Sequence, residues 1–306
     1  MKKKIAIYDC AGMGVCPSDY ICLLDHYPGP DEKTNAQSFS HQGGGPVATA
    51  LCVPGMWGAS VAMIGVTGDD DDGRFVVREF EKYGVDTRFI RALPRARTAC
   101  AFIWVDVTTG RRTCVLDRTG MPFLRAKDIT SAALPPAKFF HTDGRDTEAC
   151  IKAMKLYKKA GTQVIIDAGS VRPRMDELIA STDHFIASHN FARQFFGPNP
   201  NAKTVCTRIL EMGPSVAIVT LGEKGCVGAT KDGGTFEIAG HSRAGYIVDT
   251  NGAGDVFHGA YIYGLIQGWD VERCAKLANA AAFLKCGSPG GRLGIPPLKK
   301  ALSLAK

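Results

Sequence analysis

Apolar and polar positions along the chain alternate in blocks that predict buried strands followed by helices. The residues from Ala59 to Gly65 form a short apolar run, and the apolar side chains from Phe75 to Tyr83 recur at helical spacing. Further blocks predict a helix over 152–159 and buried strands over 163–167 and 216–220. Strands that alternate with helices are typical of a mainly parallel sheet with helices on both faces. The pattern predicts a three-layer α/β fold in a single domain over 1–306, with ligands beyond the carboxyl ends of the strands.

Two segments interrupt this alternation, because they look rich in strands and lack a helical partner. They run over about 14–41 and 98–116, and the second contains Thr108–Arg111, which is typical of a hairpin turn. We predict that they form a small β-sheet that acts as a lid over the strand ends. Near the N-terminus, the apolar run 5–7 meets Asp9 too soon for a signal peptide and predicts the first buried strand.

The composition excludes several classes of protein. Hydrophobic residues make up 45% of the chain and charged residues 22%, an ordinary globular balance. No apolar run approaches the roughly eighteen residues of a membrane span, so we expect no membrane segment. The net charge of +7 suits an anionic ligand, but Lys and Arg are scattered, which argues against nucleic-acid binding. The eleven cysteines form no Cys-x-x-Cys pair, and we expect them to be mostly buried in a reducing cytoplasm.

The strongest chemical signal is the stretch from Val248 to Ala260. Gly252 and Gly254 let the backbone turn tightly and approach a ligand. The apolar residues from Val256 onward predict a helix whose free N–H groups face that turn, with Asp255 at its entrance. Phosphoryl transfer to an alcohol needs such a pairing, since amides stabilise the moving phosphoryl group and a carboxylate accepts the hydroxyl proton. The local alternative is that Asp255 only caps the helix.

The same stretch resembles the C-terminal signature of the ribokinase-like (PfkB) family of carbohydrate kinases and matches it at every defined position. Other family landmarks occur in the expected order: Asp19 ahead of 24–28, the glycine-rich 43–50, the stretches 65–73 and 84–87, the loop 220–225 and the ending 285–296. The resemblance covers nearly the whole chain. In motif detail it is nearest to the sulfofructose-kinase and fructokinase-like bacterial branch.

The resemblance implies an ATP-dependent kinase that phosphorylates a sugar hydroxyl, with Mg²⁺ arriving with the ATP. The base would be Asp255, beside an anion hole formed by Gly252, Ala253 and Gly254. The sugar would contact Asp19, Gly43 and Gly44. ATP would lie over Asn190, Thr220, Gly222, Gly225 and Asn279. Members of the family also hold a monovalent cation such as K⁺, which would lie near Asp249 and Ser288.

Two residues depart from the family pattern. Ala48 stands where the family has a sugar-binding asparagine, which implies a different substrate contact. Arg193 stands where the family has a glutamate that helps to organise magnesium through water. Two interpretations of Arg193 stay open, a phosphate contact and a surface residue.

Two basic residues bear on the substrate. Arg145 follows the apolar pair Phe139–Phe140 at a predicted strand end, and Lys33 lies in the first lid segment. Because either cation suits an anionic substituent, we expect the substrate to be a ketohexose or an anionic sugar derivative. The alternatives are a nucleoside kinase of the same fold and a non-catalytic sugar-binding regulator. Two copies of the chain would associate, if at all, through the lid.

Two weaker signals have a structural and a functional interpretation. The acidic run 69–72 could bind a metal, but carboxylates at a predicted helix start are favoured there by the helix dipole alone. His258 follows Asp255 by three residues, and we expect it to pack rather than to contact substrate.

Overall fold

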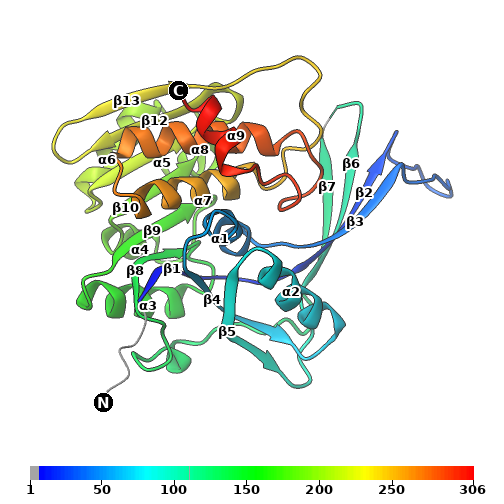
Figure 1. Ribbon diagram of the computed structural model, residues 1–306, viewed down its shortest axis with the longest axis horizontal. Coiled ribbons are helices and arrows are strands. Elements are labelled where there is room, and N and C mark those ends of the chain that lie inside the picture. Colours follow the sequence, from blue (N-terminus) through cyan, green and yellow to red (C-terminus); the bar gives the residue numbers. More distant parts are fainter. Residues whose placement is uncertain (1–6, 110) are drawn as a thin grey trace.

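The computed structural model describes residues 7–109 and 111–306, which form a large sheet enclosed by helices and a smaller sheet at its side (Figure 1). Within these residues the large sheet has nine strands, in the spatial order β13 (Thr235–Ala239), β12 (Gly225–Thr230), β11 (Val216–Thr220), β10 (His184–Ser188), β9 (Gln163–Ala168), β8 (Ala137–Thr142), β1 (Tyr8–Met13), β4 (Val61–Gly68) and β5 (Val85–Leu93). The strands from β11 to β5 are parallel, whereas β12 is antiparallel to both neighbours. The strand predicted from residues 5–7 lies mostly outside the described residues, and the first described strand starts at Tyr8.

Helices cover both faces of the large sheet and give the molecule three layers. One face carries α1 (Pro46–Met56), α2 (Asp71–Lys82), α7 (Ala253–Ile266), α8 (Val271–Lys285) and α9 (Leu298–Leu304). The other carries α3 (Thr147–Lys159), α4 (Met175–Ala180), α5 (His189–Phe196) and α6 (Ala202–Glu211). A cluster of buried apolar side chains fills the space between sheet and helices on each face. The predicted three-layer α/β fold with a mainly parallel sheet is confirmed.

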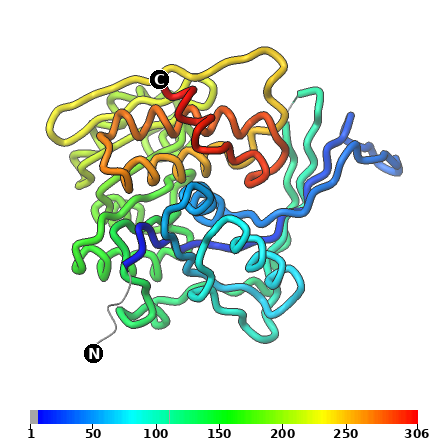
Figure 2. Tube along the Cα trace, in the orientation of Figure 1, coloured from blue at the N-terminus to red at the C-terminus, as the bar shows by residue number. Residues whose placement is uncertain are grey.

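The smaller sheet has four strands in the order β3 (Ser38–Gly43), β2 (Ser18–Leu24), β6 (Cys100–Asp106) and β7 (Arg112–Asp117). Figure 2 shows how the two segments that supply it, far apart in the sequence, lie side by side away from the main body. They coincide closely with the segments 14–41 and 98–116 predicted to form a lid. Its inner face buries Ile21, Ala101, Ile103 and Val105. The hairpin turn predicted over 108–111 includes residue 110, which lies outside the described residues.

The acidic run 69–72 forms the start of α2. Asp70 is the N-cap, and its carboxylate accepts hydrogen bonds from the Gly73 amide at 2.8 Å and from the Thr98 hydroxyl at 2.6 Å. Asp72 instead accepts a 2.7 Å hydrogen bond from the Tyr20 hydroxyl. Asp69 and Asp71 both pair with Arg74, so the four carboxylates do not converge on one point. The run connects α2 to the smaller sheet through Tyr20 and to the segment before β6 through Thr98.

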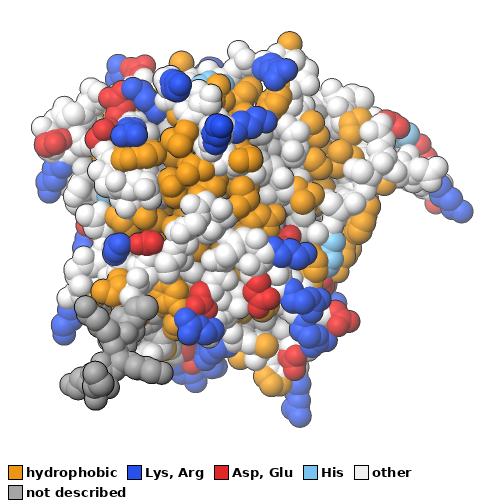
Figure 3. Space-filling model, viewed as in Figure 1, with side chains coloured by type: hydrophobic (Ala, Val, Ile, Leu, Met, Phe, Trp, Pro, Cys, Tyr) orange, Lys and Arg blue, Asp and Glu red, His pale blue; other side chains and the backbone are white. Residues whose placement is uncertain are grey.

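Hydrophobic side chains reach the surface on two parts of the molecule. In Figure 3 they gather over the helices α7–α9 and again along the four-stranded sheet. On the outer face of that sheet Phe39, Phe102, Trp104 and Val115 are exposed, and strand register places all four on the same side. No helix in the described part of the chain is long and apolar enough to cross a membrane.

Candidate active site

Three adjoining cavities lie at the carboxyl edge of the large sheet. The central cavity, about 380 Å³, is lined by residues that end or directly follow four parallel strands, Asp143, Asp167, Ser188 and Thr220. An apolar cavity of about 510 Å³ shares Thr220, Thr250 and Gly254 with it. A third, the arginine cavity, of about 280 Å³, shares Asp19, Gly45 and Arg112 with it. The central cavity is therefore continuous with a different neighbour on each side.

The first turn of α7 forms one wall of the central cavity. Gly252 adopts the left-handed conformation, with φ at 76°, and packs so closely on Gly291 that a Cβ would lie 2.6 Å from its Cα. Gly252 is the N-cap residue and has no side chain to bind the N–H groups of the first turn. A Cβ added at Gly254 would meet no atom within 4 Å. Free amides at a helix N-terminus, open to a cavity, form an anion site.

Asp255 lines the central cavity beside these amides. Its carboxylate has no hydrogen-bond partner among the described residues, so the interpretation as a helix cap is not supported. Burial, together with the negative charges of Asp167 and Asp19, raises the pKa of Asp255 to about 8, whereas the positive charges of Lys285 and Arg112 oppose the rise. The structure thus holds a partly buried, unpaired carboxylate at the position predicted for the base.

Asp19 in β2 and the glycines at the end of β3 form another part of the wall. A Cβ on Gly44 would overlap the Asp19 carboxylate, so only glycine allows this approach. Burial raises the pKa of Asp19 to about 7, while the positive charge of Arg292 lowers it. Asp19 and Gly44 both line the central cavity, but Gly43 is turned into the interior and donates its N–H to Glu79.

A buried ion pair lies behind these glycines. The Arg292 guanidinium pairs with Glu79 and donates a 3.0 Å hydrogen bond to the Gly44 carbonyl. The Arg292 amide donates to Gln42 Oε1 at 3.1 Å. The loop before Arg292 therefore holds the end of β3 in place.

His258 also contributes to the central cavity, although the sequence predicts packing. Its Nδ1 lies 2.8 Å from the Gly254 carbonyl and 3.7 Å from Asp167 Oδ2, and its ring stacks on His141. His258 is buried at the cavity wall, one helical turn beyond Gly254. Its contacts explain the packing and also place it beside Asp167.

The apolar cavity contains most of the residues predicted to bind ATP, namely Thr220, Gly222, Gly225 and Asn279. Phe257, Phe283 and Ile247 supply its apolar lining. Asn190 is exposed on α5 instead, with its amide nitrogen 3.5 Å from the Gly169 carbonyl at the edge of the central cavity. Arg193 is also exposed, and none of the three cavities includes it in its lining.

The arginine cavity lies beneath the four-stranded sheet and is lined by Arg112, Arg118 and Arg145. Only Arg145 is predicted from the sequence, whereas Lys33 is exposed between β2 and β3 and lies outside the cavity. Arg112 and Arg118 were missed because nothing local distinguishes them. The available signal was the alternation of β7, which places Arg112, Cys114 and Leu116 on one face.

Ala48, which with Arg193 departs from the family pattern, is buried in α1. Thr49 beside it lines the central cavity.

The loops predicted to hold a monovalent cation are joined by Asp249. Its carboxylate accepts one hydrogen bond from the Asn251 amide and one from the Gly290 amide, both at 2.8 Å. Its main-chain carbonyl accepts a 2.7 Å hydrogen bond from the buried Lys285 ammonium. The Ser288 amide donates to the Lys285 carbonyl at 3.1 Å.

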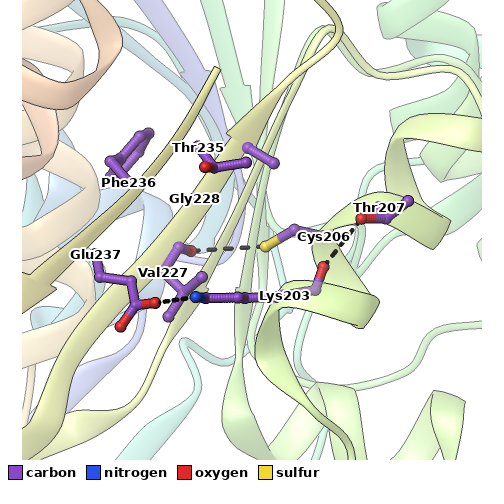
Figure 4. Close-up of a pocket in the computed structure, with 9 residues that line it drawn as sticks. Lys203, Cys206, Thr207, Val227, Gly228, Thr235, Phe236 and Glu237 are labelled. Carbon is purple, nitrogen blue, oxygen red and sulfur yellow. Dashed lines mark hydrogen bonds and ion pairs between the residues drawn. The ribbon is translucent and has the colours of Figure 1, made fainter. Parts of the chain in front are cut away.

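A separate hollow of about 330 Å³ lies between α6 and the strands β12 and β13 (Figure 4). An ion pair joins Lys203 of α6 to Glu237 of β13, and Cys206 Sγ lies 3.6 Å from the Val227 carbonyl. This hollow lacks the convergent polar groups of the three cavities at the strand ends. We therefore place the active site in those three cavities.

Comparison with known proteins identifies the family to which the chain belongs. Residues 11–298 match the family model of the pfkB family carbohydrate kinases. Mouse ketohexokinase is 25% identical over 293 residues, which cover 92% of this chain and 96% of that protein. A sugar kinase of Archaeoglobus fulgidus, itself uncharacterized, is 28% identical over 78% of this chain and 96% of its own length. Ribokinase of Arabidopsis thaliana, solved with ribose and ATP, superposes with a TM-score of 0.82 at 22% identity, over 98% of this chain and 99% of that one.

The fold and the site define a phosphotransferase that uses an alcohol group as acceptor. The chain belongs to the pfkB family of carbohydrate kinases, because the family model matches nearly its whole length. It is therefore a kinase of the class that includes sugar and nucleoside kinases. A protein from E. coli provisionally assigned as ribokinase II was solved with ATP and Mg²⁺ and superposes with a TM-score of 0.84 at 21% identity, over 97% of this chain and 99% of that one.

Proposed function

We propose that the chain transfers the γ-phosphate of ATP to a hydroxyl group of a sugar that carries an anionic substituent, with Asp255 as the base. The observation that carries this proposal is the position of the unpaired Asp255 carboxylate in the central cavity, between the apolar cavity and the arginine cavity. A hydroxyl held between Asp19 and Asp255 would face a phosphate bound at the N-terminus of α7.

ATP would place its adenine in the apolar cavity, against Phe283 and Ile247. Its γ-phosphate would enter the central cavity past Gly254, which lines both. Mg²⁺, when bound, would neutralise part of the phosphate charge. In the described residues no three His, Cys, Asp or Glu side chains are placed to hold a metal alone, which fits an ion bound mostly by phosphate and water. Asp143, whose buried Oδ2 has no hydrogen-bond partner, and Asp167 would face it.

Asp255 would act on the sugar hydroxyl. The proton moves from the hydroxyl to Asp255 while the oxygen–phosphorus bond forms and ADP leaves. The carboxylate must be ionised to accept that proton, and Arg112 and Lys285 both lower the pKa of Asp255 towards the ionised form.

The four-stranded sheet would act as the lid. Its strand β2 carries Asp19 and its strand β7 begins with Arg112, and both side chains line the central cavity. Movement of the sheet towards the large sheet would complete the sugar contacts and exclude water that competes for the phosphate.

Three guanidinium groups in one cavity support an anionic substrate. Burial lowers the pKa of Arg118, and the positive charges of Arg145 and Arg172 lower it further. Arg145 lies 3.7 Å from Asp143, but its Nε is buried without a hydrogen-bond partner. Arg118 and Arg145 line the arginine cavity and not the central one, so they lie on the sugar side of the phosphate site. A sulfonate, phosphate or carboxylate there would balance the charge through paired hydrogen bonds.

ADP release with MgATP and fructose, its phosphate and sulfonate analogues and a sugar acid tests this assignment. We expect turnover with an anionic sugar, and Arg145→Ala should raise its KM about tenfold or more because a hydrogen bond to a charged group is lost. The control Arg125→Ala removes an exposed arginine paired with Asp128 and should change nothing. A preference for neutral fructose, with only the KM for ATP altered by Arg145→Ala, would instead indicate a plain ketohexose. ATP binding without phosphorylation of any sugar would indicate the regulator.

The nucleoside alternative lacks support in the substrate cavity. A nucleoside base would need a flat, aromatic surface, and none of the described residues that line the arginine cavity is aromatic. One relative, from Methanothermobacter thermautotrophicus, is a nucleoside kinase at 21% identity over 96% of this chain and 94% of that protein, so adenosine and cytidine belong in the substrate panel as well.

Two copies of the chain would associate through the outer face of the four-stranded sheet. Phe39, Phe102, Trp104 and Val115 supply the apolar surface that such an interface needs. Light scattering after size exclusion should give a dimer that Phe102→Glu converts to a monomer.

All eleven cysteines are free, as a reducing cytoplasm favours.

A further inference from the structure

The buried ammonium of Lys285 lies where the family resemblance places a monovalent cation. Lys285 ends α8, and its side chain is fully buried. An ammonium group is costly to bury unless it is paired, and this one donates a 2.7 Å hydrogen bond to the Asp249 carbonyl. Burial lowers the pKa of Lys285, whereas the negative charges of Asp249 and Asp255 raise it. The lysine is thus a positive charge fixed between the two loops.

The oxygens of Asp249 are already bound. Its two carboxylate oxygens accept hydrogen bonds from the Asn251 and Gly290 amides, and its carbonyl faces Lys285. A second cation at this place would stand next to an ammonium group where both Asp249 and Lys285 are fully buried, and like charges repel strongly there. The residues present therefore do not fit a bound K⁺.

We propose that Lys285 takes the place of the monovalent cation, so that this kinase works without K⁺. The ammonium holds the Asp249 loop and, through the Asp249–Gly290 hydrogen bond, the loop that packs on Gly252. The shape of the anion hole at the start of α7 therefore depends on the Lys285 ammonium and not on a bound cation. The test of this inference by turnover rests on the proposed function. The test by the effect of K⁺ on thermal unfolding does not.

The wild-type protein is the first test. Turnover should agree within about twofold in potassium, sodium and choline chloride at equal ionic strength. The three salts then screen charges equally and differ only in the cation, which this kinase would not bind. Thermal unfolding without nucleotide should show no saturable shift specific to K⁺. A saturable K⁺ activation, or a K⁺-specific rise in Tm, would overturn the proposal. The Tm measurement decides even if no sugar is phosphorylated, so the two proposals can fail separately.

Removal of the ammonium is the second test. Lys285→Ala should lower kcat on the order of tenfold or more, because the amides of the anion hole lose their support. Methylammonium or K⁺ should restore part of the kcat and raise the Tm of this variant alone, which a purely structural lysine would not predict. Lys276→Met, on the exposed side of the same helix, is the control. A folded Lys285→Ala with normal kcat and no response to cations would also overturn the proposal. If the variant does not fold, the wild-type measurements still decide.

Discussion

The first turn of α7 and the arginine cavity both present positive potential to a ligand, but they are built in opposite ways. The turn uses main-chain amides from consecutive residues, and its shape depends on Gly252 and Gly254. The arginine cavity uses side chains from β7, the segment after it and the end of β8. The difference indicates that the proposed phosphate site is a local property of the sequence, whereas the proposed substrate site is a property of the assembled fold.

The strongest test of the local site is Asp255→Asn. Loss of a general base should lower kcat by on the order of a hundredfold or more, while ATP still binds. Coupled assays of ADP release and calorimetric titration with ATP measure the two effects. Asp176→Asn, an exposed carboxylate on α4, serves as the control. Near-normal turnover of Asp255→Asn would remove Asp255 from the chemistry.

Gly254→Val should have the next largest effect. Because a Cβ at this position meets no protein atom within 4 Å, the variant should fold normally. Its side chain would enter the central cavity and lower kcat about ten- to a hundredfold by crowding the anion hole. Circular dichroism checks the fold, and Gly29→Val, in the exposed loop of the smaller sheet, is a control. The local model fails if the folded variant turns over at the parental rate.

The pH dependence should be smaller but characteristic. The base must be ionised, and the pKa of Asp255 is raised to about 8. The kcat/KM for the sugar should therefore rise about tenfold per pH unit below this value and level off above it. The folded protein also binds a proton that the unfolded chain releases above about pH 4, so the free energy of unfolding should fall between about pH 4 and 8. Urea titrations should show a weaker fall in Asp255→Asn.

Lys33→Ala should have the smallest effect. The side chain lies outside the arginine cavity, so kcat and KM should change less than about twofold, as for most surface substitutions. Steady-state kinetics on the anionic substrate measure this. A large rise in KM would show that the loop between β2 and β3 folds onto the cavity during turnover, and the substrate site would then include more of the chain than the structure brings together.

The sequence predicted the fold, and it also predicted the residues that form one half of the proposed site, for a physical reason. Strand and helix periods, and the motif around Gly252 and Asp255, depend on neighbours in the chain. The arginines depend on strand pairing between β6 and β7 and on the approach of β8, which no local pattern expresses. Lys33 shows that the sequence can also suggest a residue wrongly. It belongs to the predicted lid segment, but it is exposed and lies outside the arginine cavity. Lys285, whose motif was recognised, was not assigned a role because its partner Asp249 is distant in sequence.

The buried pair of Arg292 and Glu79 has a consequence for how the sequence of this chain can change. The two residues are 213 positions apart, and each leaves an unpaired buried charge if the other is lost, at a cost of about 3–5 kcal/mol. A single substitution of either residue is therefore strongly destabilising. The same cost protects Gly43 and Gly44, because the pair holds both of them in place. The arginine cavity carries less of this restriction, since Arg112 and Arg118 make no salt bridge among the described residues and would pair with a ligand instead. New substrates can be acquired there one residue at a time, while the end of β3 stays as it is.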